Sequence, residues 1–213
     1  VVHTLFEAFI LVGIVVFLFL GDWRSTLIPA LAVPVSLIGT FALMNFFGIT
    51  LNLISLFALV MAIGVVVDDA IVVIEAVHAK MEEKGLSPLR ATEEAMHEIS
   101  GAIIAITFVM AAVFVPVAFM SGPVGIFYRQ FSITMATAII LSGIVALTLT
   151  PALCAMILKN NHNQPRKKTM LNSFLLRFNH LFNKGSFKYE KILHKTVNKR
   201  TVTFGMLMAF CVG

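Results

Sequence analysis

Two adjacent carboxylates, Asp68 and Asp69, lie inside a long apolar stretch of the sequence. No charged residue occurs from position 51 to position 67, and five apolar residues separate Asp69 from Glu75. A charged side chain at bilayer depth costs about 2.5–3.5 kcal/mol on insertion scales, and such residues typically line proton or ion pathways. The pair therefore predicts transport chemistry, in which a carboxyl group binds a proton or a cation and later releases it.

Helix geometry limits how these carboxylates can be arranged. Adjacent helical residues diverge by about 100°, so Asp68 and Asp69 cannot share one point, although both can face one interior sector. Gly64, four residues before Asp68, would leave room for a neighbouring helix to approach closely. Glu75 lies on the same face as Asp68, near the predicted inner boundary of the membrane. It is either an interfacial or packing carboxylate or a further member of the pathway.

Three roles are open for the carboxylate pair from these residues alone. Desolvation and a second nearby carboxylate both favour the protonated form, which suits a proton relay. Carboxylates also bind hard cations such as sodium, and the hydroxyls of Thr40, Ser55 and Thr107 are the other candidate oxygen ligands. A structural polar contact between helices is the third role. No basic residue lies at the same depth in this sequence, so we expect a basic partner, if there is one, to lie elsewhere.

The composition places the chain among membrane proteins. It has 213 residues, of which 59% are hydrophobic and 13% charged, whereas soluble domains are about 45–50% apolar and about 25% charged. The net charge of +5 does not form a separate basic domain, so we expect no nucleic-acid partner. Cys154 and Cys211 lie in apolar segments without metal-ligand spacing, and we expect no metal site and no cofactor.

Apolar runs of the length that spans a bilayer predict an all-α membrane protein. We expect a bundle of five complete transmembrane helices at about residues 5–20, 27–47, 51–76, 101–120 and 131–158. Residues 159–200 are expected to form a cytoplasmic basic linker with an amphipathic interfacial helix, whose apolar positions from Leu171 to Phe182 share one face. Residues 201–213 would begin a sixth span. Within the polar stretch from 78 to 100, Ser87 and Pro88 predict a helix start.

The basic residues predict the orientation of these spans. With alternating spans, Arg24, residues 80–90 and the basic linker all fall on one face, and Arg129 alone falls on the other. Lys and Arg mark the cytoplasmic face, so we expect residue 1 to lie on the outer side. The chain begins at Val1 and ends at Gly213 within an apolar run. We therefore expect an internal piece of a longer protein.

The stretch from Gly64 to Glu75 resembles the fourth transmembrane helix of resistance-nodulation-division (RND) efflux pumps, in the AcrB-like hydrophobe/amphiphile branch. Four other stretches agree with this family in the same order, and the resemblance weakens only from about residue 160 to residue 200. These stretches are residues 27–35, 113–119, 128–134 and 149–154.

This resemblance implies a proton-driven antiporter that exports hydrophobic or amphiphilic compounds, in which Asp68 and Asp69 carry protons and no enzymatic reaction occurs. It also implies a lysine partner and porter domains in the remainder of the pump, and a homotrimer in a bacterial inner membrane. A periplasmic adaptor and an outer-membrane channel would be its further partners. An RND-related transporter of metals, lipids or export substrates is the alternative within transport, and a scaffold or sensor subunit is the alternative outside it.

Overall fold

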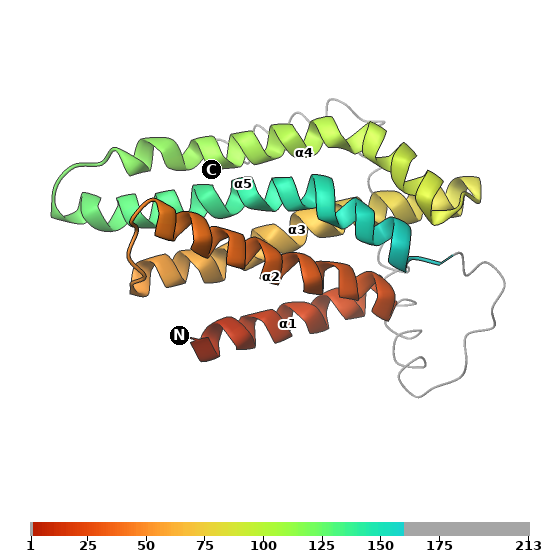
Figure 1. The fold of residues 1–213 in the computed structure, drawn as a ribbon, viewed down its shortest axis with the longest axis horizontal. Helices are drawn as coiled ribbons and strands as arrows, with labels where there is room; N and C mark the ends of the chain where they lie inside the picture. Colours follow the sequence, from red (N-terminus) through yellow and green to blue (C-terminus); the bar gives the residue numbers. More distant parts are fainter. Residues whose placement is uncertain (1, 160–213) are drawn as a thin grey trace, which may run out of the picture. The chain divides into compact units, whose positions relative to one another are not determined.

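The structure is a computed structural model that describes residues 2–159, and these residues form helices with no strand. The prediction of an all-α fold is confirmed for this part of the chain. The five helices are shown in Figure 1, and their bounds are α1 Val2–Leu20, α2 Trp23–Phe46, α3 Leu53–Lys84, α4 Pro88–Ala118 and α5 Pro123–Ile157. The predicted amphipathic helix and the predicted sixth span lie outside the described residues.

The ends of α3 follow from local capping chemistry. The Oδ1 atom of Asn52 accepts hydrogen bonds from the backbone N–H of Ile54 and of Ser55, at 3.0 and 2.9 Å. The Ser55 hydroxyl oxygen accepts in return from the Asn52 N–H, at 2.9 Å. This reciprocal capping box satisfies N–H groups that the first turn of a helix leaves unpaired. At the other end Gly85 takes a left-handed conformation, with φ of 62°, which stops the helix.

The predicted start of a helix at Ser87 and Pro88 is confirmed. Helix α4 begins at Pro88 and Ser87 occupies the N-cap position, although its side chain makes no capping hydrogen bond. The fixed φ of proline suits the first helical position, where the missing N–H costs nothing. The local sequence therefore sets this boundary without the help of the serine hydroxyl.

Helix α5 lies against three other helices, α2, α3 and α4, whereas α1 packs mainly on α2 and α3. Figure 1 shows α1 along one edge of the five-helix unit and α4 along the opposite edge. The connections alternate between the two ends of the unit, so α3 and α5 run in the same direction and α4 runs against both. An alternating bundle is what the predicted membrane topology requires.

Four helices, α2 to α5, are long and apolar enough to cross a membrane, and α1 contributes a shorter apolar stretch at Phe6–Leu20. Five spans were predicted, so four of them have the required length and composition. At about 1.5 Å per residue, the 32 residues of α3 extend about 48 Å, which exceeds the roughly 30 Å of a bilayer core. The excess lies at its charged end, next to the charged start of α4.

Candidate functional site

Asp69 turns from α3 toward α5. Its side chain is partly buried, and the Ser142 hydroxyl donates a hydrogen bond of 2.5 Å to its Oδ2 atom. Ser142 itself is 1% exposed. A hydroxyl that donates to a carboxylate stabilises its ionised form. The contact joins α3 to α5, which also packs on α2 and α4.

Asp68 lies on a different face of α3 and is exposed. No hydrogen bond or ion pair to its carboxylate occurs within residues 2–159. The sequence suggested that both aspartates could face one interior sector. In the described part they face different surroundings, because a step of one residue turns a helix by about 100°.

Gly64 and Glu75 lie on the same exposed face of α3 as Asp68. A Cβ atom added at Gly64 would have no heavy atom within 4 Å, so nothing in the described part occupies the space that the glycine leaves open. Seven exposed residues at helical spacing form what we call the acidic stripe, which is apolar except for its glycine and two carboxylates. They are Phe57, Met61, Gly64, Asp68, Val72, Glu75 and Ala79.

The three hydroxyls considered as cation ligands have different environments. Thr40 donates to the carbonyl of Ser36 at 2.8 Å, and Ser55 donates to the carbonyl of Asn52 at 3.0 Å. Both are therefore engaged in their own helices. The Thr107 hydroxyl is buried and has no hydrogen-bond partner in the described part of the chain. Among those same residues, no group of three or more His, Cys, Asp or Glu side chains could hold a metal ion.

Two polar contacts were not predicted from the sequence. Ser142 was not singled out, although a serine followed by a glycine in an uncharged span was the signal available. Ser25, fully buried at the start of α2, has its hydroxyl 2.8 Å from Nε2 of His78 on α3 and donates to Asp22 at 3.3 Å. This second contact ties α2 to α3 at the predicted cytoplasmic end.

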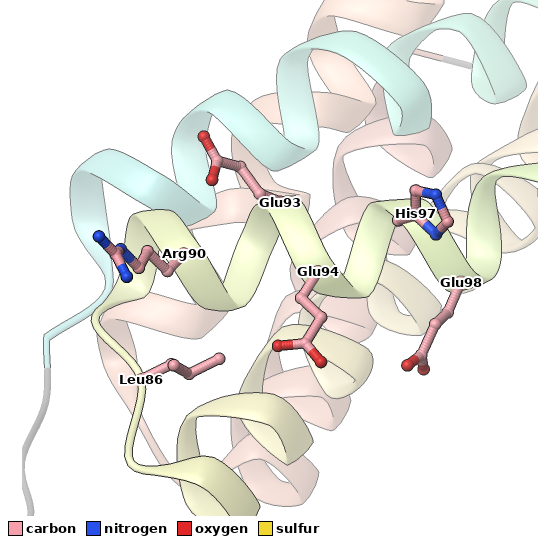
Figure 2. Close-up of a pocket in the computed structure, with 6 residues that line it drawn as sticks. All are labelled: Leu86, Arg90, Glu93, Glu94, His97 and Glu98. Carbon is pink, nitrogen blue, oxygen red and sulfur yellow. The ribbon is translucent and has the colours of Figure 1, made fainter.

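A surface hollow of about 720 Å³ lies at the start of α4. Figure 2 shows its lining: Glu94 and Glu98 point to one side of α4, whereas Glu93 and His97 point to the other. Lys80 of α3 lies 2.6 Å from Glu98, and Lys84 pairs with Glu94. The hydrogen bond with Lys80 lowers the pKa of Glu98, and the same bond raises the pKa of Lys80. The hollow therefore lies on the surface of the α3–α4 hairpin, whose two helices are joined by these ion pairs.

This chain is similar to known transport proteins. Residues 1–213 match the AcrB/AcrD/AcrF family. The solvent-resistant pump membrane transporter SrpB of Pseudomonas putida is 49% identical over 195 residues, which cover 90% of this chain and 18% of SrpB. The multidrug export protein AcrF of Escherichia coli (strain K12) is 48% identical over 198 residues, 92% of this chain and 19% of AcrF.

The toluene efflux pump membrane transporter TtgB, also of Pseudomonas putida, matches the whole chain, at 44% identity over 216 residues. These residues cover 20% of TtgB. The chain therefore spans about a fifth of the length of the curated relatives that it matches.

Proposed function

Because the chain belongs to the AcrB/AcrD/AcrF family of RND transporters, we propose that it is the proton-coupling membrane part of a drug/proton antiporter. The observation that carries this proposal is the environment of Asp69. Its carboxylate is partly buried on a helix of membrane-spanning length, and its hydrogen-bond donor is the neutral hydroxyl of Ser142. An ionisable group in such a place is a functional group by default.

The mechanism starts from the charge of the aspartate pair. Asp68 and Asp69 take up a proton from the outer side, which removes negative charge from the middle of α3. A lysine from the remainder of the pump, facing the acidic stripe, balances the ionised pair, and protonation weakens that attraction. Asp69 accepts a hydrogen bond from Ser142 of α5, so a change in its protonation alters the contact between α3 and α5. Helix α5 also packs on α2 and α4. Release of the proton to the cytoplasm resets the pair.

The remaining parts of the proposal concern the whole transporter. We place it as a multi-pass protein in a bacterial inner membrane, as a homotrimer with a periplasmic adaptor and an outer-membrane channel. Its substrates would be hydrophobic or amphiphilic compounds, handled by porter domains outside these 213 residues. The names of the relatives, which include solvent, toluene and multidrug transporters, favour this class. They favour it over the export of metals or lipids and over a scaffold role.

The test uses the full-length transporter in a bacterial strain that lacks its own efflux pumps. Drug resistance is measured for Asp68→Asn, for Asp69→Asn and for the double variant, with membrane protein levels matched by immunoblot. We expect each single change to abolish resistance, because an amide neither carries nor releases the proton. Glu83→Gln, an exposed carboxylate near the end of the same helix, is the matched control and should retain resistance.

A second measurement separates proton coupling from a scaffold role. In proteoliposomes with an imposed pH gradient, the unmodified transporter should exchange drug for protons, and the double variant should not. Export by the double variant at the unmodified rate, with normal protein levels, would refute the proposal.

A further inference from the structure

The Thr107 hydroxyl differs from most threonine hydroxyls in these helices. Six others donate to the carbonyl four residues earlier: Thr26, Thr40, Thr92, Thr134, Thr137 and Thr148. Such back-bonding is the ordinary local use of a threonine in a helix. Thr107 does not make this bond, and its buried oxygen is one of four hydroxyls without a partner in the described part. A buried polar group without a partner costs free energy, and a functional role is one reason for a protein to keep it.

The Thr107 side chain packs closely against α5 at Gly143. A Cβ atom added at Gly143 would lie 2.5 Å from Thr107 Oγ1 and 2.8 Å from its Cγ2. The threonine therefore packs against bare backbone, in space that any other residue at position 143 would fill. Gly143 directly follows Ser142, the residue that donates to Asp69.

Two apolar clusters indicate that Asp69, Thr107 and Ser142 lie at the same level of their three helices. One helical turn toward the start of α3, the three helices contribute Val65, Ala111 and Ala138 to a single apolar cluster. One turn toward the end of α3, they contribute Val73, Ile103 and Ala146 to another. Residues four apart lie one above the other on a helix. Between the two clusters, the same positions on the three helices are Asp69, Thr107 and Ser142.

Few other charged groups can influence this layer. Residues 25–46 of α2, 99–118 of α4 and 130–157 of α5 contain no Asp, Glu, Lys, Arg or His, and neither do residues 8–20 of α1. On α3 itself, Asp68 is adjacent and Glu75 lies almost two turns away. Within the described part, Asp68 is therefore the adjacent charge, and the hydroxyls of Thr107 and Ser142 are the other polar groups at the level of Asp69.

The two protonation states of a carboxyl group need different partners. A carboxylate only accepts hydrogen bonds, so the donor Ser142 suits the ionised form. A protonated carboxyl also carries an O–H donor, which requires an acceptor when it is buried. The lone pairs of the unpartnered Thr107 oxygen are available for that hydrogen.

We propose that Thr107 is a positioning residue for proton uptake, whose hydroxyl accepts the hydrogen of protonated Asp69 while Ser142 serves the ionised form. This inference rests on the proposed function of the aspartate pair and adds a second, state-specific partner to it. No covalent bond changes: one proton is bound on uptake and the same proton leaves on release. Thr107 and Ser142 then have opposite effects on the midpoint of Asp69 protonation.

The test is an infrared titration of the purified full-length transporter in lipid membranes. The carbonyl band of protonated Asp69 is assigned by its loss in Asp69→Asn. Thr107→Val keeps the shape and removes the hydroxyl, and it should move the protonation midpoint down by about one pH unit, a tenfold loss of proton affinity. Ser142→Ala should move the midpoint up, and Thr107→Ser should restore the unmodified value.

Thr148→Val is the matched control. Thr148 already donates to Ile144 and is exposed, so removing its hydroxyl should leave the midpoint unchanged. An unchanged or raised midpoint in Thr107→Val, in a protein whose Asp69 band titrates, overturns the role of Thr107 alone. If no Asp69 band titrates in the unmodified transporter, the proposed function and this inference both fail.

Discussion

The Ser142 hydroxyl of α5 donates a 2.5 Å hydrogen bond to Oδ2 of Asp69 on α3, across the contact between two helices that run in the same direction. This bond connects α3, which packs on the four other helices, to α5, which packs on α2, α3 and α4. A hydrogen bond to a charged group contributes about 1.5–3 kcal/mol. The bond is therefore large enough for its loss to be measured in function.

Replacing Ser142 with alanine removes the donor that favours the ionised form of Asp69. We expect the alkaline limit of transport in proteoliposomes to move to higher pH by about one to two units, since one pH unit corresponds to about 1.4 kcal/mol. Ser142→Thr keeps a hydroxyl and should stay near the unmodified profile. A transport profile that is the same in Ser142→Ala and in the unmodified protein would show that the bond has no bearing on coupling.

The cap of α3 should stabilise the bundle more than the start of α4 does. Asn52 accepts from two backbone N–H groups, and its Nδ2 atom donates to Gln130 on α5. Loss of such a cap costs about 0.5–2 kcal/mol, so Asn52→Ala should lower the thermal unfolding midpoint of the purified transporter. Asn52→Asp keeps the cap but loses the donor to Gln130, and we expect an intermediate loss.

Ser87→Ala is the control for this prediction, because Ser87 occupies an N-cap position without a capping hydrogen bond. It should change the unfolding midpoint little. Equal losses in Asn52→Ala and Ser87→Ala would contradict the assignment of stability to the Asn52 side chain.

The close approach of α4 and α5 at Gly143 predicts a loss of stability on substitution. The methyl group of Gly143→Ala would lie 2.5 Å from Thr107 Oγ1, so Thr107 or the helices must shift. Overpacking of this kind costs about 1–3 kcal/mol, and the unfolding midpoint should fall. The double variant Gly143→Ala/Thr107→Ala removes the contacts with Oγ1 and Cγ2 and leaves only the Thr107 Cβ, at 3.1 Å, so it should recover part of that loss. No recovery would mean that Thr107 is not the residue in conflict.

The ion pair of Lys80 and Glu98 predicts a pH-dependent contribution to stability. The hydrogen bond with Lys80 lowers the pKa of Glu98 in the folded state, so its contribution is present above the unfolded pKa and is lost as the pH falls through the folded value. The pKa of Lys80 is raised, so its contribution is lost only as the pH rises through that raised value. Glu98→Gln should thus flatten the acid side of the stability profile.

The size of this effect should be small and reduced by salt, because exposed pairs contribute little. Thermal unfolding of the purified transporter at acid pH, in low and in high salt, measures it. Glu82→Gln, an exposed carboxylate on the same hairpin, should leave the acid side unchanged. An acid loss in Glu98→Gln as large as in the unmodified protein would argue against the pair.

The features that the sequence predicted correctly depend on a few neighbouring residues. Apolar runs of sufficient length predicted five spans, of which four are helices long enough to cross a membrane. Ser87 with Pro88 predicted where α4 begins. The partners of Asp69 could not be predicted, because Ser142 lies 73 residues away and its approach depends on how α5 packs. Thr107 was named as a candidate oxygen ligand, but its missing back-bond and its contact with Gly143 are properties of three packed helices.

Substitutions at Gly64 test whether another helix packs on the acidic stripe. A Cβ atom at Gly64 or at Gly13 would have no heavy atom within 4 Å in the described part. From these contacts alone, alanine at either position should be tolerated, and Gly→Ala within a helix adds about 0.5–1 kcal/mol of stability. Gly64 differs because it lies four residues from Asp68, on the face where the basic partner of the proposed mechanism would pack.

We therefore expect Gly64→Ala to lower drug resistance in the full-length transporter at normal protein levels, and Gly13→Ala to retain it. Gly64→Leu should lower resistance further, because a larger side chain pushes the neighbour farther from Asp68. If Gly64→Leu retains full resistance, no helix approaches α3 closely at this level. The basic partner of Asp68 would then have to reach the stripe with a long side chain from a more distant helix.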